Sequence, residues 1–377
     1  MLAQRHLGYL GLAIVAGLVA ADPAFADAKA RSDTSYGVQW NTQNQTPPAG
    51  DLKKEWQNNP GGSTYVMQVF VQAPAISASI PPAAPFPVGD GVTSDPAAAP
   101  QKTKFTENPA GTATAGKAWG TISDATAGNF ATASATGASV RRAVPRVGMD
   151  PRIVWEASYN PRATARASAV AGVPRATAWA KVFDPWDLHD YAFIGGGSPN
   201  PNDVLYETAA LSLAPILEVD APTSLDSAVA VSETRLSIED VEVFRMILTL
   251  SEANNQTLFS ADIGFDPLAQ LFRYHFDANG EVIIDSLLAP GDFITEINSY
   301  FNSGTGLWTA PAGGINVLVA HKLLQPTSFY ESGGHVSASY IGSDRVFAQV
   351  TPEPGTIVLF GGGLLLAAAR RRRRTTG

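Results

Sequence analysis

Short segments in which apolar and polar residues alternate, separated by turn residues about every ten positions, make up much of the chain. Alternation with a period of two predicts strands that bury one face, and no long segment shows helical periodicity. The predicted strands cover residues 63–72, 131–136, 241–250, 314–324 and 334–340. This pattern predicts an all-β fold, either a sandwich or a jelly-roll-like arrangement.

Composition sharpens this picture without changing the fold class. Charged residues make up only 16% of the chain, against about 25% in ordinary globular proteins, and small residues recur throughout. The alternating Ala-Thr-Ala-Ser-Ala-Thr of residues 131–136 predicts a thin strand of small side chains; a low-complexity spacer is the alternative. We expect a β-rich ectodomain over 109–350, preceded by a Pro/Ala-rich loop or linker over 73–108 and a polar segment with the first strands over 27–72.

The clearest local prediction is a hairpin whose tight turn is Asn279-Gly280, the preferred pair for a type I′ turn. Aromatic residues alternate along the strand before it and are expected on one buried face. The predicted partners are Phe276 with Ile283, Tyr274 with Asp285, and Phe272 with Leu287. Just upstream, Asp266 to Ala269 forms either a helical turn or a simple bend.

The first 26 residues have the features of a secretory signal peptide. A weakly basic start at Arg5 precedes an apolar stretch from Leu7 to Ala20. Ala24 and Ala26 supply small residues at the two positions that a signal peptidase inspects. We therefore expect signal peptidase to cut after Ala26, with a non-cleaved anchor as the alternative.

Residues 352–377 have three consecutive parts: the tripeptide Pro352-Glu353-Pro354, an apolar helix over 355–369, and a basic cluster. A helix of fifteen residues covers roughly 22 Å, short of the bilayer's hydrocarbon core of about 30 Å. This length suits transient membrane insertion. The cluster is expected on the cytoplasmic side and consists of Arg370, Arg371, Arg372, Arg373 and Arg374.

This tail resembles the PEP-CTERM sorting domain of proteins that Gram-negative bacteria export across the inner membrane. All three parts match, although the resemblance covers only about residues 352–374. It implies recognition of Pro352, Glu353 and Pro354 by exosortase, a membrane peptidase. It also implies removal of the helix and transfer to the cell surface or extracellular matrix, often alongside exopolysaccharide. A plain tail anchor is the alternative.

Charge and cysteine content restrict the function. The net charge is −8; removal of residues 1–26 and of the apolar helix with its arginine cluster leaves 20 basic and 33 acidic residues, a net charge of −13, which disfavours nucleic acid as a partner. The chain has no cysteine, so disulfides and thiolate chemistry are excluded. Residues 141–181 carry eight basic and two acidic residues, whereas 182–300 carry three arginines and twenty acidic residues. These segments either face each other or form separate patches for an anionic polymer and divalent cations.

The best candidate for a metal site is a short acidic stretch around Trp186. Three carboxylates and an imidazole within seven residues suit calcium or a transition metal; the alternative is a loop anchored by Trp186. The candidate ligands are Asp184, Asp187, His189 and Asp190. No cofactor is predicted.

Three functions are compatible with these features. The first is a non-enzymatic surface or matrix protein, sorted through its tail and associated with exopolysaccharide. The second is a carbohydrate-binding module, whose groove would be lined by aromatic side chains. The third is a glycan hydrolase, which needs two carboxylates about 5–10 Å apart across a cleft. The candidate groove residues are Trp155, Trp179, Trp186 and Trp308.

Overall fold

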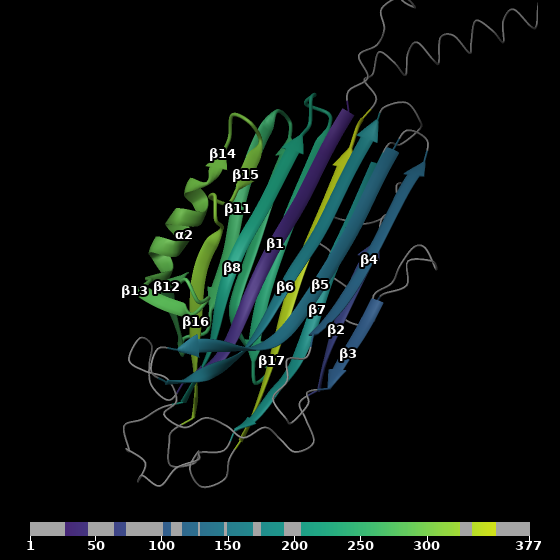
Figure 1. Cartoon of the computed structure of the whole chain (residues 1–377). Helices are drawn as coiled ribbons and strands as arrows, with labels where there is room; N and C mark the ends of the chain where they lie inside the picture. The colour runs from purple at the N-terminus through teal and green to yellow at the C-terminus, as the bar shows by residue number, and fades with distance from the viewer. Residues whose placement is uncertain are drawn as a thin grey trace, which may run out of the picture.

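The protein folds as two antiparallel β-sheets packed face to face (Figure 1). The computed structural model describes residues 27–43, 64–72, 101–106, 115–126, 129–146, 149–168, 175–191, 205–324 and 334–351. Side chains are described over 27–40, 130–137, 156–167, 175–183, 206–323 and 337–351. This architecture confirms the predicted all-β sandwich.

The larger sheet has ten strands, and its centre is formed by the first strand of the chain. Every pairing is antiparallel. The strand order is β13 (Val282–Leu287), β12 (Ala269–Phe276), β16 (Ile315–Leu324), β8 (Leu205–Asp220), β1 (Asp27–Gln43), β6 (Met149–Ser168), β5 (Asn129–Arg146) and β4 (Ala115–Thr126). Two short strands branch from this order: β15 (Leu307–Thr309) pairs with β8, and β14 (Phe301–Asn302) pairs with β15.

The smaller sheet has seven strands, and its central strand is the last one described. It is also antiparallel throughout. The order is β11 (Gln256–Phe265), β10 (Val241–Ala253), β9 (Ser227–Ile238), β17 (Gly334–Gln349), β7 (Arg175–Tyr191), β2 (Thr64–Gln72) and β3 (Gln101–Thr106). The predicted strands correspond to β2, β5, β10, β16 and β17. The structure gives β3 inside the predicted 73–108 loop, and residues 73–100 lie outside the described ranges.

Two hairpins close with two-residue turns that the sequence analysis did not identify. Glu239 and Asp240 have φ of 50° and 63°, and Asn254 and Asn255 have φ of 54° and 58°. Two consecutive positive φ values are the property of a type I′ turn, whose twist matches that of the flanking strands. Asparagine tolerates this conformation well, so the Asn254-Asn255 pair was a usable turn signal.

The predicted β12–β13 hairpin forms, but its turn type was wrong. Gly280 N donates to Asp277 O (3.0 Å), Asp277 N donates to Glu281 O (2.9 Å), and only Gly280 in the turn has positive φ, 78°. This is a three-residue loop closed by a glycine, instead of a type I′ turn. The longer loop moves the register: Phe272 pairs with Leu287 as predicted, whereas Tyr274 pairs with Ile284 and Phe276 with Val282.

Three further details concern the β12–β13 hairpin and the residues just before it. A bulge between Arg273 and Tyr274 restores the predicted pairing further from the turn. Phe276 is 43% exposed, so it is not the core residue that the pattern indicated. Ala269 N donates to Asp266 O (2.9 Å), which makes residues 266–269 a simple bend before β12.

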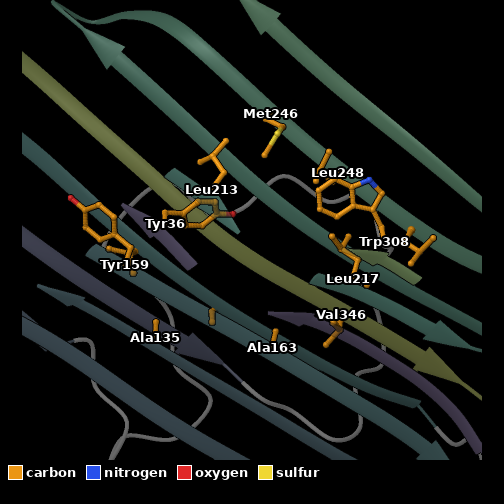
Figure 2. Close-up of a cluster of buried hydrophobic side chains, with 14 of the residues drawn as sticks. Tyr36, Ala135, Tyr159, Ala163, Leu213, Leu217, Met246, Leu248, Trp308 and Val346 are labelled. Atoms are coloured by element: carbon orange, nitrogen blue, oxygen red, sulfur yellow. The ribbon is translucent and has the colours of Figure 1, made fainter. Parts of the chain in front are cut away.

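The core has a thin half and a thick half. Under β5, β6 and β7 the inward positions are almost all alanine, and these residues are essentially inaccessible to solvent. Sheets lined by alanine approach more closely than the usual spacing of about 10 Å. Figure 2 shows Ala135 and Ala163 in this half, and Leu213, Leu217, Met246, Leu248 and Trp308 filling the wider half.

One short helix, α2 (Pro290–Ser299), closes the thick half beside β11. It was not predicted. Proline occupies its first turn, where a missing N–H costs nothing. Phe293 and Ile297 enter the core, and Trp308 Nε1 donates to the Ile297 carbonyl (2.9 Å). The helix therefore fills volume that neither sheet can cover.

Candidate functional site

The feature with the most direct bearing on function is the point at which the chain leaves the sandwich. β17 pairs with β9 on one side and β7 on the other, up to Gln349. The next residue, Val350, is 2% exposed and belongs to the core. Thr351 follows, and its backbone N–H donates to Asp226 Oδ1 (3.0 Å). The chain is thus held by the fold up to the residue before Pro352.

Asp226 is itself fixed inside the β8–β9 loop. Its Oδ2 accepts from Thr223 N (3.2 Å) and Thr223 Oγ1 (2.9 Å), and its own N–H donates to Thr223 O (3.1 Å). The residue is 2% exposed. Three donors to one buried carboxylate offset the cost of removing it from water. We call Thr223, Asp226 and Thr351 the Asp226 clamp.

The first described residue lies at the same end of the sandwich. β1 begins at Asp27, beside Ser168 at the end of β6. Across the two sheets, Ser32 Oγ contacts Asp344 Oδ1 (2.6 Å), and Tyr36 meets Tyr340 edge-on, so β1 and β17 run in opposite directions on facing sheets (Figure 1). Four residues towards the end of the sandwich, Ala28 therefore faces Ala348. The start of β1 and the end of β17 thus lie opposite each other at this end.

We call this end of the molecule the C-terminal pole; it is formed by the start of β1, the end of β8, the β8–β9 loop and the end of β17. Both predicted processing sites are joined to it. Ala24 and Ala26 immediately precede Asp27, and the Pro352-Glu353-Pro354 tripeptide immediately follows Thr351. These residues and the cluster from Arg370 to Arg374 lie outside the described ranges.

The predicted metal candidates lie on a continuous strand. Asp184, Asp187, His189 and Asp190 belong to β7 and pair with Tyr340, Ser337, Val336 and His335 of β17, with a shift of register between Val336 and Ser337. The loop considered as the alternative is therefore wrong, although the side chains of these four residues lie outside the described set. Among the described residues, no group of three acidic or histidine side chains could hold a metal ion.

The oppositely charged segments meet through β1. β6 lies on one side of β1 and the acidic β8 on the other. The basic residues of β6 pair with acids of β1, and the basic residues of β1 pair with acids of β8, so in this sheet β1 lies between the two segments and pairs with both. The pairs are Arg166–Asp27, Arg162–Asp33 (3.3 Å), Arg31–Glu218 (3.8 Å) and Lys29–Asp220 (3.8 Å).

A second group that the sequence did not reveal is the buried carboxyl of Asp344 on β17, which is 0% exposed. Ser32 Oγ and Thr34 Oγ1 each lie 2.6 Å from its Oδ1. Thr34 Oγ1 also contacts Ser232 Oγ (2.9 Å), which contacts the Tyr36 hydroxyl (2.8 Å). This network joins β1 to β9 and β17 and lies at the centre of the sandwich, near Tyr36 in Figure 2.

Burial favours the protonated form of Asp344. Ser32 Oγ and Thr34 Oγ1 both donate to its Oδ1, and these hydrogen bonds favour the ionised form. Burial outweighs them and raises the pKa of Asp344 to about 8, so the carboxyl group is largely protonated at neutral pH.

Three tyrosines surround this network. Tyr340 stacks on Tyr159 with ring centroids 4.3 Å apart and meets Tyr36 edge-on at 5.7 Å. Burial raises the pKa values of Tyr36 and Tyr340, so both stay neutral. The Tyr340 ring folds back over Gly342, where an added Cβ would lie 2.5 Å from its hydroxyl oxygen. Glycine at 342 is thus required by packing.

The tryptophans do not form the predicted carbohydrate groove. Trp308 is fully buried and Trp179 is 7% exposed. Trp155 lies on β6 in the ten-stranded sheet and Trp186 on β7 in the seven-stranded sheet. The two fully buried carboxyl groups also lie far apart. Asp344 contacts Ser32, which pairs with Leu217 of β8. Glu207 lies ten residues from Leu217 along that strand, roughly 33 Å away.

Comparison with known proteins places the tail in a defined class. Residues 350–374 match the PEP-CTERM protein-sorting motif. No curated protein matches the chain. Among solved structures, the outer membrane protease OmpT from Escherichia coli aligns over 87% of this chain and 98% of OmpT, at 8% identity and a TM-score of 0.15. A similarity that low carries no argument about fold or activity.

The motif establishes how the protein is handled. It marks an exported protein that is sorted to the cell surface at the membrane and processed by the membrane peptidase exosortase. Within the part of the chain that the structure describes, no helix is long and apolar enough to cross a membrane.

Proposed function

We propose that this protein is a non-enzymatic component of the cell surface or extracellular matrix of a Gram-negative bacterium, associated with exopolysaccharide. Signal peptidase removes residues 1–26, and exosortase then processes the tail that holds the chain at the inner membrane. The observation that carries the proposal is the direct connection between the motif and a central strand. Since no linker separates Thr351 from Pro352, the processed product is the sandwich itself.

The shape of the sandwich suits an extended surface component. β17 has sixteen residues and β6 has twenty, and at about 3.3 Å per residue such strands extend roughly 50–65 Å. Four titratable groups have strongly raised pKa values. Asp344, Tyr36 and Tyr340 lie in the core between the two sheets, and Tyr274 is buried in the smaller cluster around β12. Their position supports a structural role for these groups.

The sorting route is tested by Glu353→Ala in a host with exosortase. Glu353 is the only charged residue between the ectodomain and the apolar helix. We expect the variant to stay in the membrane fraction while the wild-type protein is released. Release of the variant at the wild-type rate would contradict this role for the tripeptide.

The matrix role is tested with protein released by the host, mixed with the host's own exopolysaccharide. Co-sedimentation without new reducing ends is expected of a structural component. New reducing ends would identify a hydrolase instead. Mass spectrometry of the same material gives both termini, and we expect Asp27 as the first residue.

A further inference from the structure

The hydrogen bond from Thr351 to Asp226 lies at a specific place in the chain. Residue 352 is proline, which has no N–H. The Thr351 N–H is therefore the last backbone donor before the sorting tripeptide. The hydrogen bond to Asp226 therefore holds the chain at the last residue before the motif that has a backbone N–H to donate.

The loop that makes this contact is held independently of Thr351. At its start, Ala221 N donates to Glu252 Oε2 (2.9 Å), at the end of β10. At its end, Asp226 accepts two hydrogen bonds from Thr223. The carboxylate is thus already in place, and Thr351 docks onto it.

The C-terminal pole also exposes apolar side chains. Leu225, the neighbour of Asp226 in the loop, is 46% exposed, and Phe130 is 40% exposed. Phe130 pairs with Arg166, which pairs with Lys29, so it lies near the start of β1. Exposed leucine and phenylalanine beside a chain that continues into an apolar tail suit contact with a partner embedded in the membrane.

We propose that the C-terminal pole is the surface that meets the membrane peptidase, with Asp226 as a positioning residue for processing and Leu225 as an apolar contact. The peptidase then reads the motif against a folded surface, at a fixed distance and orientation from the sandwich. Both chain ends join this pole, so the membrane is already next to it before either cut. Asp226 acts through Thr351 and takes no part in bond cleavage.

The size of the effect follows from the freedom that the clamp removes. Releasing a backbone residue that was held in one conformation lowers the population of the productive orientation by roughly tenfold. We therefore expect Asp226→Ala to slow processing by about that factor. Asp226→Asn should retain more activity than the alanine variant, because its amide oxygen can still accept from Thr351 N.

The experiment is a pulse–chase in a host with exosortase, following conversion of full-length precursor to the processed form. Asp277→Ala is the matched control for the clamp, since Asp277 likewise accepts backbone hydrogen bonds, from Asn279 N (2.9 Å) and Glu281 N (2.7 Å), but in the β12–β13 turn. A Gly-Ser-Gly-Ser insertion between Thr351 and Pro352 leaves every described contact intact. It should slow processing about as much as Asp226→Ala.

The apolar contact has its own matched pair. Leu225→Ser should slow processing, whereas Leu268→Ser, which changes a 61% exposed leucine at the far end of the sandwich, should not. Urea unfolding of each full-length variant separates loss of stability from loss of positioning.

The outcomes distinguish this inference from the sorting role on which it depends. An insertion variant processed at the wild-type rate would overturn the positioning role, because it uncouples the motif from an intact domain. Faster processing of Asp226→Ala would overturn it as well, since the clamp would then hinder the peptidase. Equal rates for Leu225→Ser and wild type would remove the apolar contact. Failure of Glu353→Ala to block processing would instead count against the sorting motif.

Discussion

Replacing Asp344 with asparagine should make the stability of the sandwich much less sensitive to pH. Burial raises the pKa of Asp344 from its ordinary value of 3.8 to about 8 in the folded protein. Between those values the folded state holds a proton that the unfolded chain has released. The free energy of unfolding therefore falls as pH rises from 4 to 8, and levels off above 8.

The magnitude follows from the width of that window. At about 1.36 kcal/mol per pH unit, a window of roughly four units corresponds to about 5 kcal/mol, a large share of a typical stability of about 5–15 kcal/mol. Asparagine keeps the size of the side chain and an acceptor for Ser32 and Thr34, and it does not ionise. The free energy of unfolding of Asp344→Asn should therefore not fall by this amount as pH rises from 4 to 8.

The assay is urea unfolding of the wild type and of Asp344→Asn at pH 5, 7 and 8.5, followed by circular dichroism. The difference between the two proteins isolates Asp344 from the other carboxylates, and we expect it to grow in favour of the variant as pH rises. Asp240→Asn, in an exposed turn where asparagine is well tolerated, controls for the loss of one negative charge. A parallel pH dependence of wild type and Asp344→Asn would contradict the raised pKa, because it would show that the folded protein does not hold the Asp344 proton over this range.

Three further changes test the packing by thermal and urea unfolding. Ala165→Leu should destabilise by about 1–3 kcal/mol because the thin half has no room, whereas Thr164→Leu on the outer face should change stability by less than about 0.5 kcal/mol; equal effects would contradict the close approach of the sheets. Phe272→Ala should cost about 3–5 kcal/mol and Phe276→Ala much less, since the two side chains are 4% and 43% exposed. Gly342→Ala should cost at least about 1 kcal/mol because the new methyl group displaces a stacked tyrosine ring, and wild-type stability would refute that clash.

The sequence predicted the fold class, five of the seventeen described strands (β2, β5, β10, β16 and β17) and the β12–β13 hairpin, because alternation is a local signal. The alternating alanines at 131–136 form part of β5, with Ala131, Ala133 and Ala135 buried. The hairpin at Asn279-Gly280 was also found locally, but its loop is one residue longer than the pair suggests. That difference changed the cross-strand partner of Phe276 to Val282, and Phe276, at the turn end of β12, is 43% exposed.

The clamp and the buried carboxyl group were beyond reach of local patterns. Asp226 meets Thr351 across 125 positions, and Ser32 meets Asp344 across 312. Neither long-range contact is marked by neighbouring residues, because Thr351 reaches Asp226 and Ser32 reaches Asp344 only once β1 and β17 are placed in their sheets. The sorting motif shows the opposite behaviour, since its information lies entirely in consecutive residues.

The alanine-lined half of the sandwich has a consequence for how such a domain can diverge. Where the two sheets nearly touch, each inward position fixes the distance between them, and only residues as small as alanine, serine or glycine preserve it. In the wide half, leucine, methionine and phenylalanine can exchange with modest repacking. Substitutions should therefore accumulate more slowly at the alanine-lined positions than in the wide half of the same core. The stretch 131–136 looks like compositional bias. Its inward side chains set the distance between the two sheets, so the residues allowed there are limited by side-chain volume.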